Sequence, residues 1–320
     1  MFRKTLAAIL CMVMASAAMT SCGKHLEVDD DSKETSASDN QSAEETTAPA
    51  GDDKESTTAE NSGSMDNKTI DISRFADRSV PDIDTEKSDV KNFTAPEVGD
   101  DIIIMKFKGY DGEVKIRLFP EYAELGVENF VGLAEKGYYD GLTMHRIVAD
   151  FMIQGGDPLG TGTGGESLWG DKFDGGTSDK LTHAAGTIAY ANSGSTSTDG
   201  SQFYIVTGET YDNDYLSLLE SKGYSFSDDI KKILASAGGA PWLDGGYTVF
   251  GQVYEGLDII FAIQDVEVYQ GNAMNPEVST PVEPVVIEYV KVGKYEGEEL
   301  KWFIADYTGE DAPESDKDTE

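Results

Sequence analysis

A series of short, β-rich segments separated by glycine constrains the fold more than any other feature of this sequence. The series extends from Asp101 to Val292, and its first two segments lie on either side of an Asp-Gly turn at 111–112, the first partly and the second cleanly alternating apolar and polar residues. Two alternating segments joined by such a turn predict a β-hairpin. Because no regular alternation of strands and helices follows, the pattern favours an antiparallel β-barrel over a parallel sheet. We predict a mainly β fold.

Two stretches within this region have helical periodicity instead. Val127, Phe130 and Ala134 are spaced to share one face of a helix, and a glycine follows at position 137 as a stop signal. Near the end of the region, Leu257 and Phe261 indicate a second helix. We expect both helices to cap the β structure.

One connection is too long for a simple loop. Residues 208–241 contain two apolar sets at helical spacing, first Tyr215, Leu218 and Leu219, then Ile230, Ile233 and Leu234. A connection of this length is uncommon inside a compact domain unless it has secondary structure of its own. We therefore predict an inserted helical hairpin, whose apolar faces pack on each other, on the barrel, or on a partner protein.

The residues before the barrel differ sharply in composition. From 22 to 100 the chain is rich in Ser, Thr, Asp and Glu, with few aromatic residues before Phe75. Such a segment buries too little apolar surface to offset the entropy of ordering, so we predict a disordered linker over 22–100 that charge repulsion extends. The tail 296–320 is also acidic and is predicted to be unstructured. A net charge of −35 argues against nucleic acid as a partner and against electrostatic docking to anionic lipid.

The N-terminus has the layout of a secretion signal. Two basic residues precede an apolar stretch that is shorter than the roughly 20 residues needed to span a bilayer. Residues 19–22, Met-Thr-Ser-Cys, resemble a bacterial lipoprotein cleavage box, with Met19 in place of the usual leucine. We predict a signal peptide over 1–21 and lipidation of Cys22, which would anchor the chain at the extracytoplasmic side of the cell membrane. An ordinary secretory signal is the alternative. Since Cys11 would leave with the signal, the mature chain would form no disulfide.

The motifs that suggest chemistry lie between Met144 and Gly251. In chain order they are 144–148 (Met-His-Arg-Ile-Val), 151–157 (Phe-Met-Ile-Gln-Gly-Gly-Asp), 162–167 (Gly-Thr-Gly-Gly-Glu-Ser), 191–193 (Ala-Asn-Ser), 201–205 (Ser-Gln-Phe-Tyr-Ile), 242–245 (Trp-Leu-Asp-Gly) and 249–251 (Val-Phe-Gly). Together they resemble the cyclophilin family, whose members isomerise the peptide bond before proline. The resemblance covers about 101–292 without the insertion. It implies a closed antiparallel barrel of about eight strands with two capping helices, and a domain over 101–295.

The resemblance assigns the catalytic roles to Arg146 and Gln154. Arg146 would donate a hydrogen bond to the proline nitrogen as the amide twists, because twisting removes conjugation and leaves that nitrogen a hydrogen-bond acceptor. An arginine keeps its charge under all relevant conditions. Gln154 would hold the substrate carbonyl and orient Arg146. This catalysis involves no covalent step, so we predict no cofactor and no metal.

The same resemblance implies a substrate-binding set with distinct parts. The slot walls would be Phe151, Met152, Tyr204 and Leu243, with Tyr247 at the rim and Trp242 at the edge of the site. Backbone groups of Asn192 would pair with the extended substrate, Gln202 would line the neighbouring groove, and Ala191 would also contact the substrate. In the family, the matching tryptophan helps to bind cyclosporin. Tyr204 and Tyr247 stand where the best-known members have phenylalanine and histidine. We expect these departures to change efficiency or preference rather than to abolish activity.

Other chemistry is less well supported. His145 precedes Arg146 and could suggest a general base, yet isomerisation transfers no proton. His183 has no partners at metal-ligand spacing. Ser201, His145 and Asp157 could be combined into a hydrolase triad, but no nucleophile-elbow motif accompanies them.

Three hypotheses for the whole chain follow. The first is an active, monomeric isomerase whose partners are proline-containing segments of unfolded or secreted proteins, with the membrane contacted only through the N-terminal lipid. The second is a catalytically weak module that binds proline peptides or acts as a chaperone through the 208–241 insertion. The third is a solute-binding lipoprotein, which would need two α/β lobes. The Arg146 set favours the first.

Overall fold

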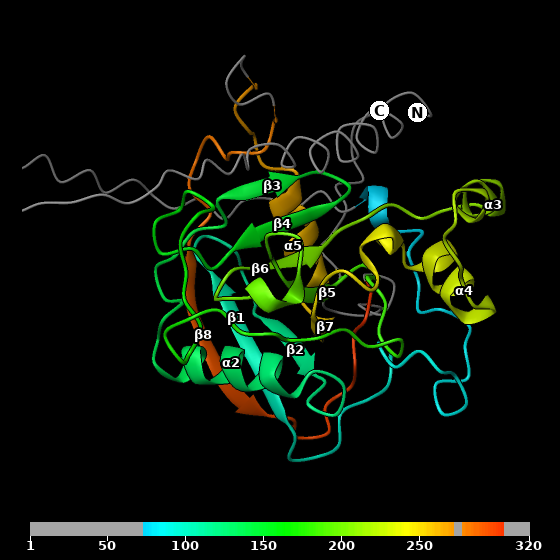
Figure 1. Ribbon diagram of the computed structural model, residues 1–320, viewed down its shortest axis with the longest axis horizontal. Coiled ribbons are helices and arrows are strands. Elements are labelled where there is room, and N and C mark those ends of the chain that lie inside the picture. The colour runs from blue at the N-terminus through cyan, green and yellow to red at the C-terminus, as the bar shows by residue number, and fades with distance from the viewer. Residues whose placement is uncertain (1–72, 272–276, 304–320) are drawn as a thin grey trace, which may run out of the picture. The chain divides into compact units, whose positions relative to one another are not determined.

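The computed structural model describes residues 73–271 and 277–303. Within them one antiparallel sheet of 8 strands follows the order β3-β4-β6-β5-β7-β2-β1-β8 (Figure 1). The strands are β1 (Asp101–Phe107), β2 (Val114–Leu118), β3 (Arg146–Val148), β4 (Met152–Gly155), β5 (Thr187–Tyr190), β6 (Phe203–Val206), β7 (Val249–Glu255) and β8 (Ile287–Lys294). The mainly β fold with eight antiparallel strands is confirmed, and the third hypothesis, with two α/β lobes, does not fit it.

The sheet curls into a half-barrel. Its end strands, β3 and β8, do not share a continuous ladder; an isolated bridge between Thr143 and Val286 joins the segments beside them. The hairpin expected around the Asp-Gly turn is β1–β2, in which Ile103 pairs with Ile116. Gly112 has φ of 77°, a backbone conformation that favours glycine, so it permits this tight turn.

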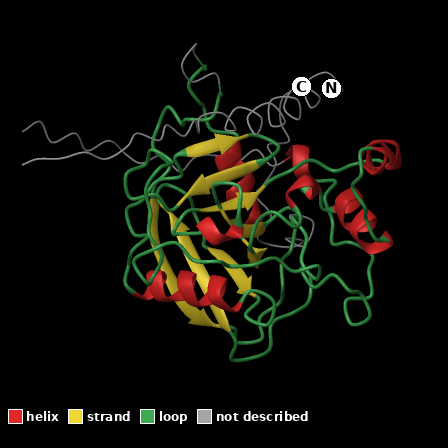
Figure 2. Ribbon diagram, viewed as in Figure 1, coloured by secondary structure: helices red, strands yellow, loops and turns green. Residues whose placement is uncertain are grey.

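Two helices cap the sheet, as expected: α2 (Glu124–Glu135) and α5 (Leu257–Gln264) (Figure 2). Helix α2 packs on β7 and β8, and α5 packs on β2, β3 and β4. The apolar stripe of α2 is buried, and the Phe130 ring stacks on Tyr139 at 4.6 Å and contacts Phe203 edge-on at 5.3 Å. These rings form the centre of the core beneath the strands that carry the site.

The insertion contains two helices, α3 (Asn213–Ser221) and α4 (Asp228–Ser236), as predicted. Each begins with a capping side chain: Asp212 accepts from the backbone N–H of Tyr215, and Ser227 accepts from that of Ile230. Leu216 and Leu219 of α3 and Leu234 of α4 form an apolar cluster with Tyr211 and Phe226, which lie outside the two helices. Because Ile233 joins the main barrel core, the insertion packs both on itself and on the barrel.

The predicted linker boundary at residue 100 is placed too late, because residues 73–100 pack along the barrel. The Phe75 ring stacks on Phe261 of α5 with centroids 4.1 Å apart, and Val90 and Phe93 are also buried. These apolar residues are few, and after a short turn at Ser73–Phe75 the segment has no helix or strand whose period could reveal them. The acidic composition of the segment therefore gave no sign of these single apolar side chains, each of which packs on the barrel. The linker before residue 73, Cys22 and the signal peptide lie outside the described residues.

The predicted boundary between the domain and the C-terminal tail, at residue 295, also differs from the structure. Trp302 and Phe303 are buried, and the Phe93 ring meets Trp302 edge-on at 5.5 Å. The two ends of the domain therefore pack against each other beside the barrel, and the acidic tail begins later than residue 296.

Arg78 connects the N-terminal segment to the insertion. Its buried guanidinium donates to the carbonyl oxygens of Ala237 at 3.1 Å and Thr207 at 3.5 Å, which flank the inserted helices. It also lies over the Phe261 ring at 4.7 Å. Burial lowers the pKa of Arg78 to about 10, but carbonyl and aromatic partners accommodate the cation at neutral pH.

Candidate active site

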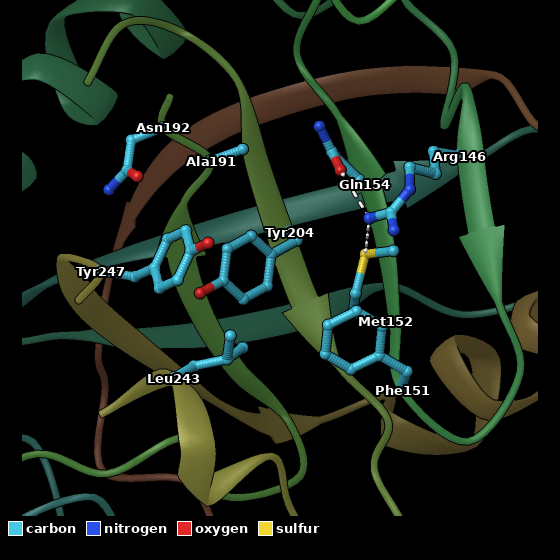
Figure 3. Close-up of a pocket in the computed structure, with 9 residues that line it drawn as sticks. All are labelled: Arg146, Phe151, Met152, Gln154, Ala191, Asn192, Tyr204, Leu243 and Tyr247. Carbon is cyan, nitrogen blue, oxygen red and sulfur yellow. Dashed lines mark hydrogen bonds between the residues drawn. The ribbon is translucent and has the colours of Figure 1, made fainter. Parts of the chain in front are cut away.

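A pocket of about 150 Å³ opens beside β3, β4 and β6. Figure 3 shows the side chains that surround it: Arg146, Phe151, Met152, Gln154, Ala191, Asn192, Tyr204, Leu243 and Tyr247. All nine belong to the predicted site set. They come from separate parts of the chain, and the curl of the sheet brings them to one place.

Strand register aligns the polar side of this pocket. Arg146 on β3 pairs with Gln154 on β4, and Gln154 pairs with Tyr204 on β6. Residues that lie opposite each other on antiparallel strands project to the same face, so the three side chains form a row. Met152 lies two residues from Gln154 and therefore projects to that face as well. The spacing within the 151–157 motif thus produces the arrangement directly.

A chain of hydrogen bonds holds the amides of this row. Arg146 Nη1 donates to Gln154 Oε1 at 3.2 Å, and Gln154 Nε2 donates to Gln202 Oε1 at 3.0 Å. Gln202 Nε2 in turn donates to the carbonyl oxygen of Gly164 at 2.8 Å. Gln202, predicted for the neighbouring groove, is not among the side chains that line this pocket; it accepts from the Gln154 amide and so holds it.

The other edge of the Arg146 guanidinium carries an ion pair that the sequence did not predict. Nε donates to Glu277 Oε2 at 2.7 Å, and Nη2 donates to Glu277 Oε1 at 2.6 Å. The hydrogen bonds from Arg146 lower the pKa of Glu277. No motif marks this glutamate, and 131 positions separate it from its partner, so only the fold could reveal it.

Aromatic and aliphatic side chains form the remaining wall. Met152, Tyr204 and Leu243 are buried in one apolar cluster, with Phe151 and Tyr247 packed against it. The rings of Tyr204 and Tyr247 meet edge-on with centroids 5.9 Å apart. This wall provides an apolar slot next to a cationic donor.

Trp242, the remaining predicted residue, lies just outside the pocket. Its indole is 5.9 Å from the Phe151 ring and 6.4 Å from the Tyr211 ring, measured between centroids. Tyr211 belongs to the apolar cluster of the insertion. Trp242 therefore packs between a pocket wall and the inserted helices.

Comparison with known proteins identifies this arrangement. The family model for cyclophilin type peptidyl-prolyl cis-trans isomerases matches residues 102–292, more than half of the chain. The chain belongs to this family. A curated peptidyl-prolyl cis-trans isomerase of Staphylococcus haemolyticus is 39% identical over 196 residues, which cover 61% of this chain and 94% of the relative. One from Staphylococcus aureus strain USA300 is 41% identical over 181 residues, which cover 57% and 87%.

A solved structure is also similar. The crystal structure of a Cryptosporidium parvum cyclophilin type peptidyl-prolyl cis-trans isomerase matches with a TM-score of 0.47 and 23% identity, covering 62% of this chain and 99% of that chain.

In this cyclophilin domain the unusual tyrosine at position 204 has a buried partner. Its hydroxyl lies 2.9 Å from His183 Nε2, and His183 Nδ1 lies 2.6 Å from Asp244 Oδ1. Burial raises the pKa of Tyr204 well above its usual value, so the phenol stays neutral. The Tyr204 hydroxyl, which a phenylalanine at this position would lack, is therefore hydrogen-bonded to buried His183. His183, for which the sequence indicated no partners at metal-ligand spacing, connects Tyr204 to Asp244.

The cyclophilin domain does not assemble the hydrolase triad considered above. The Ser201 hydroxyl donates to the carbonyl oxygen of Gly156 at 2.6 Å, and both ring nitrogens of His145 are buried without a hydrogen-bond partner in the described part of the chain. Asp157 accepts from backbone N–H groups of its own loop, including that of Gly162 at 2.7 Å.

Within 73–271 and 277–303, no group of three or more His, Cys, Asp or Glu side chains could hold a metal ion. Over the same ranges, no helix is long and apolar enough to cross a membrane.

A buried carboxyl beside the pocket predicts a pH dependence of stability. Asp199 Oδ2 accepts from Thr248 Oγ1 at 2.6 Å, and burial raises the pKa of Asp199 from 3.8 to about 6. Since the folded state binds this proton more tightly, the contribution to stability is complete below about pH 4 and is lost as pH rises through about 6. We expect Asp199→Asn to become progressively more stable relative to wild type as the pH rises from about 4 through about 6, and the difference to level off above that. Thermal unfolding midpoints of both proteins across this range provide the measurement. A difference that does not change with pH would contradict it.

Proposed function

We propose that this isomerase acts on X-Pro bonds of proteins outside the cytoplasmic membrane, with Arg146 as the donor that stabilises the twisted amide. The observation that supports this mechanism is the position of Arg146 Nη1. It is hydrogen-bonded to Gln154 at the edge of an apolar slot, on the same face as Met152 and Tyr204.

The energetic demand on such a site is modest. Rotation about a peptide bond meets a barrier of about 18–20 kcal/mol, and X-Pro isomerisation takes tens to hundreds of seconds without a catalyst. An acceleration of about 10³–10⁶ needs only about 4–8 kcal/mol of preferential binding to the twisted state. No bond is broken, so an oriented donor and a fitted pocket suffice.

The described residues supply both parts. The apolar wall would receive the proline ring and exclude water, which strengthens a charge-assisted hydrogen bond. Gln154 cannot rotate freely, because its own amide donates to Gln202. An Arg146 donor held in this way favours the twisted nitrogen, which accepts a hydrogen bond, over the planar one, which does not.

A catalytically weak binding module is the second candidate, and the packing of the insertion favours it less. Leu216 and Leu219 point into the apolar cluster of the insertion, and Ile233 lies in the barrel core. The inward faces of these helices are therefore already occupied by the chain itself. The insertion supports the pocket through Trp242 rather than offering its main apolar face to a partner.

Exchange spectroscopy by NMR on a short X-Pro peptide tests the proposal. We expect residues 73–303 to raise the cis–trans exchange rate of the peptide at substoichiometric concentration. Peptide binding without faster exchange would instead support the binding module.

We further propose that the chain is anchored outside the cytoplasmic membrane by lipid on Cys22. The support is the signal pattern of 1–21 followed by the cleavage box at 19–22.

Cys22→Ala is expected to move the protein from the membrane fraction to the secreted or unprocessed fraction. One acyl chain binds membranes only marginally, whereas two hold firmly, so the loss of the diacylated cysteine removes the anchor. Cell fractionation with mass measurement of the N-terminus checks this. Cys11→Ala is the matched control and should fractionate like wild type. If Cys22→Ala remains with membranes as before, the lipoprotein interpretation is wrong.

A further inference from the structure

The segment that carries Glu277 is attached to the edge of the barrel. After α5, the backbone N–H of Tyr269 donates to the carbonyl oxygen of Thr280 at 2.8 Å. Ile147 N on β3 donates to Ser279 O at 2.7 Å. This bond joins the segment to the strand that carries Arg146. Glu277 is thus two residues from a backbone anchor on β3.

The Glu277 carboxylate meets Arg146 as a two-pronged pair. The two bonds, at 2.7 and 2.6 Å, join both carboxylate oxygens to Nε and Nη2 on one edge of the guanidinium. The Ser279 hydroxyl donates to Glu277 Oε2 at 2.8 Å and limits rotation of the carboxylate. Paired bonds of this kind fix the plane of a guanidinium as well as its position.

This pairing leaves the opposite part of the guanidinium toward the pocket. Nη1 makes no bond to the carboxylate; it bonds Gln154 Oε1 and lies 3.6 Å from Met152 Sδ. Figure 3 shows Nη1 pointing to these two pocket residues. Glu277 therefore occupies the donors that face away from the slot and leaves Nη1 at its edge.

We infer that Glu277 is a positioning residue for the isomerisation, and this inference rests on the proposed role of Arg146. An arginine side chain loses rotamer entropy when it is held in one geometry. A partner that holds it before substrate arrives removes part of that cost from the catalytic step. Glu277 does not line the pocket, so it should influence the rate more than the binding of the peptide.

The test compares Glu277→Ala, Glu277→Gln, Arg146→Ala and the double variant Arg146→Ala/Glu277→Ala. We expect Glu277→Ala to lower kcat for an X-Pro peptide about three- to tenfold with KM nearly unchanged. Glu277→Gln keeps one acceptor oxygen and the side-chain length, so its loss should be smaller. Glu283→Ala, an exposed glutamate further along the same segment, is the matched control and should retain wild-type kcat.

The double variant shows whether Glu277 acts through Arg146. If it does, adding Glu277→Ala to Arg146→Ala should cause no further loss, because residues that act as a unit are not additive. Additive losses would overturn the inference. Wild-type or faster turnover in Glu277→Ala, with Arg146→Ala impaired, would also overturn the inference. The carboxylate would then either have no effect on catalysis or hold Arg146 away from the substrate. Undiminished turnover in Arg146→Ala would instead contradict the proposed mechanism itself. Near-ultraviolet circular dichroism of each variant confirms that the compared proteins are folded.

Discussion

Arg146→Ala is expected to lower kcat/KM for an X-Pro peptide by at least about tenfold. A tenfold loss corresponds to only about 1.4 kcal/mol of transition-state stabilisation, and the variant removes the only cation that lines the pocket among the described residues. The thermal midpoint should change little, because the Arg146 side chain is 30% exposed and its partner Glu277 is 43% exposed. Water can therefore solvate the carboxylate left behind. Exchange rates measured by NMR, together with a thermal melt, provide the check.

Two further variants separate guanidinium geometry from charge. Arg146→Lys keeps the cation but cannot bond Glu277 with two parallel donors while also reaching Gln154, so we expect it to lose activity as well. Arg74→Ala is the matched control, because Arg74 pairs with Asp150 and Asp265 and does not line the pocket. It should turn over peptide like wild type. Full activity in Arg146→Ala would eliminate the proposed mechanism.

Ile233→Ala is expected to destabilise the domain by about 2–5 kcal/mol, the usual cost of truncating a large buried aliphatic side chain. Ile233 lies on α4, within the insertion, yet its side chain is 0% exposed and belongs to the barrel core. Leu218→Ala on α3 is the matched control: Leu218 is 42% exposed, so its loss should change stability by no more than about 0.5 kcal/mol. Urea denaturation of the three proteins measures the difference.

This pair of variants decides whether the insertion is an accessory or part of the domain. If Ile233→Ala unfolds at the same urea concentration as wild type, the inserted helices are separable from the barrel. The expected loss would show that they contribute to its core. Replacement of 212–239 by a short Gly-Ser linker should then also destabilise the domain, because it removes Ile233 together with Leu216 and Leu219.

Much of the fold could be predicted because its signals are local. The period of Val127, Phe130 and Ala134 indicated α2, and a two-residue alternation around an Asp-Gly turn indicated β1–β2. The insertion was also visible as two helical periods, but the period alone did not show where the apolar faces pack. Leu218 was grouped with the apolar face and is exposed, whereas Leu216 is buried.

The boundaries were predicted less well, for a related reason. Composition averages over many positions, and the stretch before residue 100 is acidic as a whole. Phe75, Val90 and Phe93 nevertheless fill sites on the barrel. Segments without helix or strand give no repeating pattern. Single apolar residues within them therefore cannot be recognised as buried until the barrel surface on which they pack is known.

The sequence by itself determined the first hairpin, the two capping helices and the motifs that carry Arg146, Gln154 and Tyr204, which strand pairing aligns in one row. Only the tertiary structure decided which side chains hold that row in place. Glu277 reaches Arg146, His183 reaches Tyr204, and Asp244 reaches His183, across separations at which no periodicity relates the partners. The physical reason is that hydrogen bonds and ion pairs act over about 3 Å in space, whereas the patterns in a sequence describe only neighbours along the chain. The curl of the sheet and the course of the loops bring these partners together.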